Sequence, residues 1–299
     1  MTPLQAAADA PDPDEVIKLW PRSPPGAPAG LVPEEVLPRS PPHGMRDRAV
    51  IHVATPTLTV FRSRASHGGT VLIIPGGGYA RVVVDKEGFE TARYLASRGY
   101  TAFVLRYRLP GDPWAAGPDV ALQDAQRAMR LIRASLGEAQ VNRIAVIGFS
   151  AGGHVAGSLA TRGAETTYPA VDDADAAPAS PNAACLIYPV ISMREAIAHP
   201  GSRQEMFRSG LAGEEDRYSL ERRVTATAPP TFLCHAADDT TVPVENSLEM
   251  FKALKAAKVP AEMHIFEDGQ HGFGMRFLEA KSARAWPELM TAWLRKHGV

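Results

Sequence analysis

Short apolar runs alternate with longer amphipathic segments along most of this 299-residue chain. The run at residues 70–75 (TVLIIP) is apolar at nearly every position, as is typical of a strand buried on both faces. Such alternation predicts an α/β fold with a mainly parallel central sheet flanked by helices. The predicted strands after the first are 101–107, 143–149, 184–190, 231–234 and 261–266, and the predicted helices are 89–97, 120–135, 151–161, 244–257 and 283–296.

Residues 1–45 differ from the rest of the chain in composition. Eleven of the 26 prolines fall in this segment, and proline suits neither a regular helix nor a central strand. We expect an extended, polyproline-like arm that packs partly on the domain surface through Ile17, Leu19 and Trp20. The prediction is a proline-rich N-terminal arm over 1–45 and one α/β domain over 46–299.

Several segments of the domain lie outside the regular alternation. Residues 49–53 and 58–62 resemble two short strands, and we expect them to form an antiparallel lead-in to the sheet. Residues 165–182 are rich in Ala, Asp and Pro and predict a loop excursion. Residues 193–224 have mixed helical character and suggest a small lid over the carboxyl edge of the sheet.

Charge and hydropathy exclude several classes of partner. The formal net charge is −1, which gives no basic field for nucleic acid and no polybasic patch for a membrane. No apolar stretch reaches the roughly 18 residues of a membrane span. Residues 1–16 are acidic and lack an apolar core, so they do not form a signal peptide. The sequence leaves the compartment open: it is cytoplasmic on its face, and periplasmic or secreted if a leader has been removed. It also indicates no oligomeric state.

The two cysteines, Cys185 and Cys234, lie in apolar runs that predict neighbouring strands. Their spacing fits no metal site. One would lie near the start of its strand and the other near the end of the next, which disfavours a disulfide. We expect two buried thiols.

The most informative motif is Gly148-Phe149-Ser150-Ala151-Gly152. It follows an apolar predicted strand and begins a helix of small residues, which is the context of a nucleophile elbow. Such an elbow needs strained dihedral angles at the serine and a close approach of strand and helix, and the flanking glycines allow both. The motif therefore predicts Ser150 as a catalytic nucleophile, with a structural turn as the alternative.

A glycine run, Gly76-Gly77-Gly78, follows the strand at 70–75. Backbone N–H groups in such a run can face a site without interference from side chains, as in an oxyanion hole. A phosphate-binding loop is the alternative, but it would require a Lys and a Ser or Thr, and Tyr79 and Ala80 follow here.

The general base should be a histidine that follows the last strand. Among nine histidines, His264 falls inside a predicted strand and His154 on the helix after Ser150, where a structural role is expected. His271 lies in a glycine-flanked loop after the strand at 261–266. It is therefore the predicted base, with an exposed loop histidine as the alternative.

A serine nucleophile and its histidine base act together with an acid that orients the histidine. We expect this acid after the strand that precedes 261–266, where Asp238 and Asp239 are adjacent. Asp239 begins a D-x-x-V-P segment that would fix the loop and start the next helix. We therefore prefer Asp239 to Asp238 as the residue that orients His271. Along the chain, the order Ser150, Asp239, His271 is the nucleophile–acid–base order of the α/β-hydrolase fold.

These motifs together resemble the acetyl esterase/acetylxylan esterase group of α/β-hydrolases, often labelled xylanase-B-like or feruloyl-esterase-like. The resemblance runs from about Ile17 to the end of the chain. The matching segments are Leu19-Trp20-Pro21, Ile73-Ile74-Pro75-Gly76-Gly77-Gly78-Tyr79, Lys86-Glu87-Gly88, Gln123-Asp124-Ala125-Gln126-Arg127, Gly148-Phe149-Ser150-Ala151-Gly152-Gly153-His154, Asp239-Thr240-Thr241-Val242-Pro243 and Gly272-Phe273-Gly274.

The resemblance implies an α/β-hydrolase catalytic domain over 46–299 that hydrolyses short acyl esters, often acetyl esters on plant cell-wall carbohydrate, without metal or other cofactor. The oxyanion donors that it implies are the backbone N–H groups of Gly77, Gly78 and Ala151. The related hormone-sensitive-lipase group has a histidine at the position of Pro75. The proline therefore favours membership of the carbohydrate-esterase group over the lipase group. Family members are frequently exported.

The expected substrate is a small-molecule or oligosaccharide ester. The alternatives are a general short-chain or feruloyl esterase, a prolyl-oligopeptidase-like peptidase, and a non-enzymatic binding protein of the same fold. The arm is too short for the propeller domain of such a peptidase, and the intact serine, aspartate and histidine argue against a binding protein.

Overall fold

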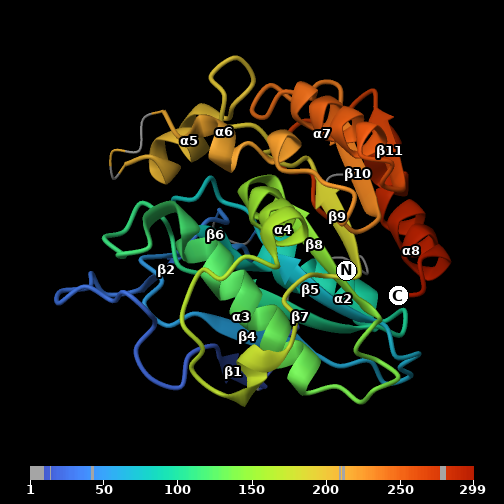
Figure 1. The fold of residues 1–299 in the computed structure, drawn as a ribbon. Coiled ribbons are helices and arrows are strands. Elements are labelled where there is room, and N and C mark those ends of the chain that lie inside the picture. Colours follow the sequence, from blue (N-terminus) through green and yellow to red (C-terminus); the bar gives the residue numbers. More distant parts are fainter. Residues whose placement is uncertain (1–9, 14, 42–43, 209, 211–212, 277–280) are drawn as a thin grey trace.

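The computed structural model describes residues 10–13, 15–41, 44–208, 210, 213–276 and 281–299 (Figure 1). Within these residues an eight-stranded sheet has the order β1-β4-β7-β5-β8-β9-β10-β11, and a three-stranded sheet has the order β2-β3-β6. The strands of the large sheet, in that order, are Val16–Lys18, Thr57–Phe61, Thr101–Arg106, Thr70–Ile74, Ile144–Phe149, Ala183–Ile187, Thr231–Ala236 and Ala261–Phe266. Those of the small sheet are Glu35–Pro38, Arg48–Ile51 and Val82–Val83.

In the order of the large sheet, the strands from β7 through β5, β8, β9 and β10 to β11 are parallel, and β4 runs antiparallel to both of its neighbours, β1 and β7. Every residue of β5, β8 and β9 is buried, as their continuous apolar runs predict. Helices flank the sheet, and α3 and α4 lie side by side across it in Figure 1. The predicted mainly parallel sheet flanked by helices is therefore confirmed.

The longer helices begin and end within a few residues of their predicted positions. They are α2 (Glu90–Ala96), α3 (Val120–Ala134), α4 (Ser150–Arg162), α7 (Glu245–Ala256) and α8 (Trp286–Lys296). A π-helical turn, η1 (Val84–Phe89), precedes α2 and was not predicted. The shorter helices are η2 (Gly117–Asp119), η3 (Asp173–Ala176), α5 (Pro200–Met206), α6 (Glu215–Tyr218), η4 (Leu220–Arg222) and η5 (Ser282–Ala285). Of these, α5, α6 and η4 fall in the segment predicted as a lid.

The N-terminal arm contributes a strand to each sheet, since β1 pairs with β4 and β2 pairs with β3. Leu19 and Trp20 are buried, and the Trp20 indole N–H donates to Asp124 Oδ1 at 2.8 Å. Part of the arm thus packs on the domain through the apolar residues named above. Residues 1–9, 14 and 42–43 of the predicted arm lie outside the described residues, and the division at residue 45 stays a prediction.

The predicted antiparallel lead-in is wrong in one respect. The strand β4 does run antiparallel to β7 in the large sheet, but β3 pairs with β2 and β6 in the small sheet. His52, which follows β3, has a positive φ of 51°, and the chain leaves one sheet for the other at this turn. An apolar pattern indicates a strand but does not identify the strand it pairs with.

Cys185 and Cys234 are both buried and unpaired, on the adjacent strands β9 and β10. Cys185 lies opposite Phe232, and Cys234 lies opposite Ile187, so the thiols are two residues out of register.

Among the residues described, no helix has the length and apolar character needed to cross a bilayer.

Candidate active site

Ser150 lies at the sharp turn between β8 and α4. Its φ is +53°, a left-handed conformation that costs energy for a residue with a side chain. A Cβ on Gly148 would lie 2.4 Å from the carbonyl oxygen of Gly152, and a Cβ on Gly152 would lie 2.2 Å from that of Ile74. Glycine is therefore required on both sides of the serine, because strand and helix approach too closely for any side chain.

The structure brings Ser150, His271 and Asp239 together. His271 Nε2 lies 2.8 Å from Ser150 Oγ, and His271 Nδ1 lies 2.7 Å from Asp239 Oδ2. A carboxylate accepts hydrogen bonds, so Nδ1 carries the proton and Nε2 is free to accept the proton of the serine hydroxyl. This is the geometry that a serine nucleophile and its general base require.

The two adjacent aspartates occupy different positions. Asp239 Oδ1 accepts hydrogen bonds from the backbone N–H groups of Thr241 and Val242, each at 2.9 Å, and Oδ2 faces His271. Asp238 is exposed and accepts from the backbone N–H groups of Gly269 and Gln270, at 2.9 and 2.7 Å. Asp238 therefore holds the loop that carries His271, whereas Asp239 contacts the imidazole itself.

Hydrogen bonding keeps Asp239 ionised in a buried position. Burial alone would raise the pKa of this carboxyl, but hydrogen bonds from His235 and His271 outweigh that effect and hold the pKa well below its usual range. Asp239 therefore stays negatively charged beside the imidazole, as the stabilisation of an imidazolium requires.

Gly77 and Gly78 lie in the loop after β5 with φ values of 137° and 67°. A Cβ on Gly77 would lie 2.2 Å from the carbonyl oxygen of Arg81, so the loop excludes a side chain there. Neither glycine N–H donates to an acceptor within the described part of the chain. Gly76, next to them, approaches the elbow so closely that its Cβ would lie 2.8 Å from the Cβ of Ser150.

A buried glutamate, Glu87 of η1, connects the glycine loop to the loop of His271. Its Oε2 accepts from the backbone N–H of Gly76 at 2.7 Å, and its Oε1 accepts from the hydroxyl of Tyr188 at 3.0 Å. The Tyr188 oxygen in turn accepts from the backbone N–H of Gly274 at 3.1 Å, and its ring packs edge-on against His271. Two loops that carry site residues are thus fixed to one carboxylate.

A second buried network joins the glycine loop to the lid. Tyr79, with a φ of 62°, contacts His154 Nδ1 through its hydroxyl at 2.7 Å, and His154 Nε2 lies 2.6 Å from the carbonyl oxygen of Tyr218. A carbonyl only accepts, so Nε2 is protonated and Nδ1 accepts from Tyr79. The role expected for His154 was structural, and its contacts here are all within the fold.

We predict that His154 makes stability depend on pH. Burial lowers the pKa of His154 from its ordinary 6.5 to about 4, so between these values the unfolded chain binds more protons than the folded protein. The contribution of His154 to the free energy of unfolding should be complete above pH 6.5. It should decrease by about 3 kcal/mol as the pH falls to 4.

Urea unfolding at pH 7 and pH 4.5 checks this prediction. The variant His154→Gln can still accept from Tyr79 and donate to Tyr218, and it should lose clearly less stability between the two pH values than the wild type. An equal loss in both proteins would contradict the assignment.

His199, at the start of α5, brings the lid close to the site. Its Nδ1 accepts from the backbone N–H of Ser202 at 3.1 Å, and its Cε1 lies 3.6 Å from where a Cβ on Gly78 would be. Burial and the nearby His271 lower its pKa, although Asp239 acts in the opposite direction. The lid therefore places an imidazole beside the glycine loop.

Four residues around the site have no role in the predictions made from the sequence: Glu87, Tyr188, His199 and His235. Glu87 lies in one of the segments that carry the resemblance, and His235 stands four residues before Asp239, so their positions were a usable signal. Tyr188 and His199 lie far from the motifs along the chain, and only the fold brings them near.

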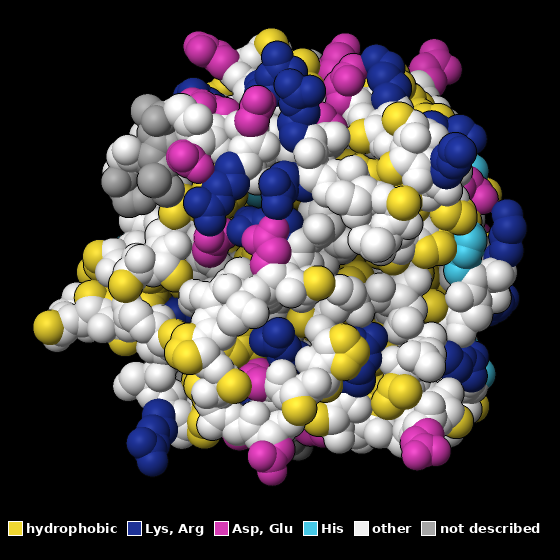
Figure 2. Space-filling model, in the orientation of Figure 1, with side chains coloured by type: hydrophobic (Ala, Val, Ile, Leu, Met, Phe, Trp, Pro, Cys, Tyr) yellow, Lys and Arg dark blue, Asp and Glu magenta, His cyan; other side chains and the backbone are white. Residues whose placement is uncertain are grey.

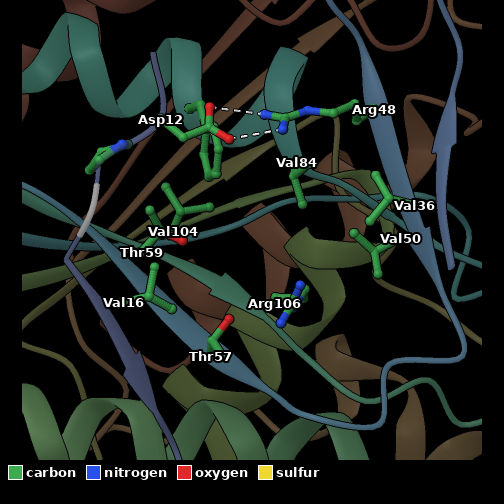
Figure 3. Close-up of a pocket in the computed structure, with 12 residues that line it drawn as sticks. Asp12, Val16, Val36, Arg48, Val50, Thr57, Thr59, Val84, Val104 and Arg106 are labelled. Carbon is green, nitrogen blue, oxygen red and sulfur yellow. Dashed lines mark hydrogen bonds and ion pairs between the residues drawn. The ribbon is translucent and has the colours of Figure 1, made fainter. Parts of the chain in front are cut away.

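The pocket in Figure 3 lies at the β1–β4–β7 edge of the large sheet, and none of Ser150, His271 and Asp239 lines it. It has a volume of about 290 Å³ and lies between β1, β3, β4 and β7, with Arg48 paired to Asp12 at its rim. Its apolar lining consists mainly of Val16, Val36, Val50, Val84 and Val104.

Within the described ranges, no cluster of three or more His, Cys, Asp or Glu residues has the arrangement of a metal site.

The elbow and the parallel sheet beneath it are those of the α/β-hydrolase class. Residues 62–254, more than half of the chain, match BD-FAE, and the chain belongs to this family. Residues 215–298 also match the Dienelactone hydrolase family. The resemblance to the acetyl esterase/acetylxylan esterase group is confirmed by these matches and by the relatives below.

Two curated relatives are similar in sequence: Endo-1,4-beta-xylanase B of Butyrivibrio fibrisolvens, 34% identical, and the acetylxylan esterase of Xylanibacter ruminicola, 30% identical. The matches cover 68% and 73% of this chain but 32% and 43% of those relatives. The chain therefore spans less than half the length of either. A solved structure, the acetyl ester-xyloside bifunctional hydrolase from Caldicellulosiruptor lactoaceticus, has a TM-score of 0.75 and 31% identity, and the match covers 96% of this chain and 97% of that one.

Proposed function

We propose that this chain is a serine carboxylesterase that hydrolyses short-chain esters, principally acetyl esters of carbohydrate. The observation that carries the proposal is the linear arrangement Ser150–His271–Asp239, with contacts of 2.8 and 2.7 Å at a strained elbow. The catalytic roles are those expected from the sequence: Ser150 is the nucleophile, His271 the general base and Asp239 the residue that orients the base.

In the proposed reaction, Ser150 Oγ attacks the ester carbonyl carbon while its proton passes to His271 Nε2. The imidazolium is stabilised by the buried charge of Asp239 and then donates its proton to the leaving alcohol. Water, deprotonated by His271, hydrolyses the acyl-enzyme and releases the acid. No step in this sequence requires a metal or another cofactor.

The oxyanion of the tetrahedral intermediate would be held by the backbone N–H groups of Gly77, Gly78 and Ala151. Two features support this assignment. The glycine N–H groups donate to nothing in the described part of the chain, and the hydrogen bond from Gly76 to Glu87 fixes the loop before catalysis. A donor set that is fixed in advance stabilises developing charge without reorganisation.

The carbohydrate half of the proposal comes from the relatives. An acetylxylan esterase, a xylanase and an acetyl ester-xyloside hydrolase are by name proteins that act on xylan, acetyl esters or xylosides. The direct test is acetate release from acetylated xylooligosaccharides, with feruloyl esters and a prolyl peptide as competing substrate classes. Acetate release that exceeds the other two supports the proposal, whereas selective peptide cleavage, or no turnover of any ester, would overturn it.

The lid supports a preference for small acyl groups. Among its described large apolar side chains, Met193, Met206 and Leu220 are buried in the main core, and Ile197 and Phe207 are only partly exposed, so the lid presents little apolar surface. Its charged side chains form ion pairs such as Arg203 with Glu215. Figure 2 shows basic and acidic side chains interleaved over the part of the surface where Figure 1 places α5 and α6.

We predict that kcat/KM falls as the acyl chain of 4-nitrophenyl esters lengthens from C2 to C8. Each methylene buried in a groove would contribute about 0.8 kcal/mol, and without such a groove the longer chain gains nothing and must be accommodated in solvent. The measurement is kcat/KM across the C2, C4, C6 and C8 esters below their solubility limits. A rise toward C8 would contradict the prediction and indicate a lipase-like apolar surface.

A further inference from the structure

A second histidine, His235, lies against the carboxylate that contacts His271. It stands near the end of β10 and is fully buried. Its Nε2 lies 3.2 Å from Asp239 Oδ2, the same oxygen that His271 Nδ1 contacts at 2.7 Å. One carboxylate oxygen therefore lies between two imidazole rings, of which only one reaches the nucleophile.

The contacts of the His235 ring show where its proton is. Nε2 lies 3.0 Å from the carbonyl oxygen of Val242 as well as 3.2 Å from the carboxylate of Asp239, and both of these groups can only accept. Nε2 is therefore protonated and shares its proton between them. Nδ1 lies 2.8 Å from the hydroxyl of Ser247, which holds the ring from the side of α7.

We propose that His235 is a positioning residue for acyl transfer, whose Nε2–H fixes Asp239 Oδ2 toward His271. This inference rests on the proposed function. Backbone N–H groups of Thr241 and Val242 hold the other oxygen, Oδ1, so only His235 and His271 contact Oδ2 within the described residues. Without His235, Oδ2 would keep no contact but His271 within the described residues, and its direction would be less fixed when His271 moves during proton transfer.

The hydrogen bond from His235 also withdraws negative charge from Oδ2. Its loss should leave more charge facing His271 and favour the protonated imidazole, which cannot act as a base. The acid limb of the kcat/KM profile should then move to higher pH. Other titratable groups face this pair from three elements: Tyr188, whose ring packs against His271, His199 of the lid, and Lys86, whose Nζ lies 3.5 Å from where a Cβ on Gly272 would be. The substitutions proposed for His235 leave all three in place.

Two amide substitutions separate positioning from simple packing. His235→Gln places an amide N–H near the position of Nε2 and should keep kcat within about fivefold of wild type. His235→Asn is shorter, can still reach Ser247 but not Asp239, and should lower kcat at least 30-fold, with KM changed less than threefold and the acid limb moved to higher pH. His235→Phe should behave like His235→Asn.

His264→Phe is the matched control, because His264 lies on the neighbouring strand β11 opposite Cys234 and contacts Glu262 rather than the site. It should leave kcat within twofold and the pH profile unchanged. Folded His235→Asn and His235→Phe proteins with kcat within threefold of wild type and an unmoved acid limb would overturn the inference.

A spectroscopic measurement tests the inference without reference to activity. In ¹⁵N spectra of histidine-labelled wild-type protein at neutral pH, His235 should carry a proton on Nε2 that is protected from exchange with solvent. An unprotonated Nε2 would overturn the inference whether or not any ester is hydrolysed. A wild-type protein that shows the protected proton but hydrolyses no ester would instead overturn the proposed function alone.

Discussion

Replacing Ser150 with alanine should reduce kcat for 4-nitrophenyl acetate by about 10⁴–10⁶-fold, the loss typical of a missing nucleophile. His271 and Asp239 do not depend on the hydroxyl for their own contact, so the site should otherwise keep its geometry. The elbow backbone should also persist, because alanine and serine meet the same cost at a φ of +53°. The measurement is kcat together with the thermal midpoint of unfolding.

Ser158→Ala is the matched control for this experiment. Ser158 is a buried serine on the same helix, α4, two turns beyond the elbow. Its replacement should change kcat less than twofold. If Ser150→Ala keeps activity within tenfold of wild type, Ser150 is not the nucleophile and the proposed mechanism fails.

Replacing Asp239 with asparagine should cost roughly 10²-fold or more beyond the loss caused by the same change at Asp238. An asparagine at 239 can turn an N–H toward His271 Nδ1, which would favour the wrong tautomer and leave Nε2 unable to accept the proton of Ser150. Asparagine at 238 still has an oxygen that can accept from Gly269 and Gln270, so the loop should keep its conformation.

The measurement is kcat/KM of both variants with the same acetyl ester at the pH optimum of the wild type. Asp238→Asn should stay within about tenfold of wild type. The reverse ranking would show that Asp238 is the functional acid and that the contact between Asp239 and His271 is not used in catalysis.

Local motifs were sufficient to predict the position of Ser150. The elbow needs only a buried strand, a serine between glycines and a small-residue helix, and all three are contiguous in the sequence. His271 and Asp239 were predictable because parallel strands end at one edge of the sheet, so residues that follow such strands converge. The fold therefore placed three distant residues close together, as the order of motifs indicated.

The supporting contacts were not predictable in the same way. Glu87 holds Gly76 and Tyr188, but nothing in a single sequence shows that a π-helical turn will bring a glutamate beneath the glycine loop. The predicted pairing of the strand at 49–53 was wrong for a related reason. The partner of β3 depends on where the turn at His52 directs the chain. Long-range contacts are set by packing, which local patterns do not encode.

In the proposed mechanism, Ser150 forms a covalent bond to the acyl carbon of an ester. The most direct test is reaction with diethyl 4-nitrophenyl phosphate, which leaves a stable diethylphosphoryl group on a serine nucleophile, followed by peptide mass spectrometry and an activity assay on the same sample. We expect one adduct per chain, located on Ser150, and a loss of acetyl-ester hydrolysis in proportion to labelling. Complete labelling of Ser150 with activity retained, or complete inactivation with the adduct on another residue, would contradict it.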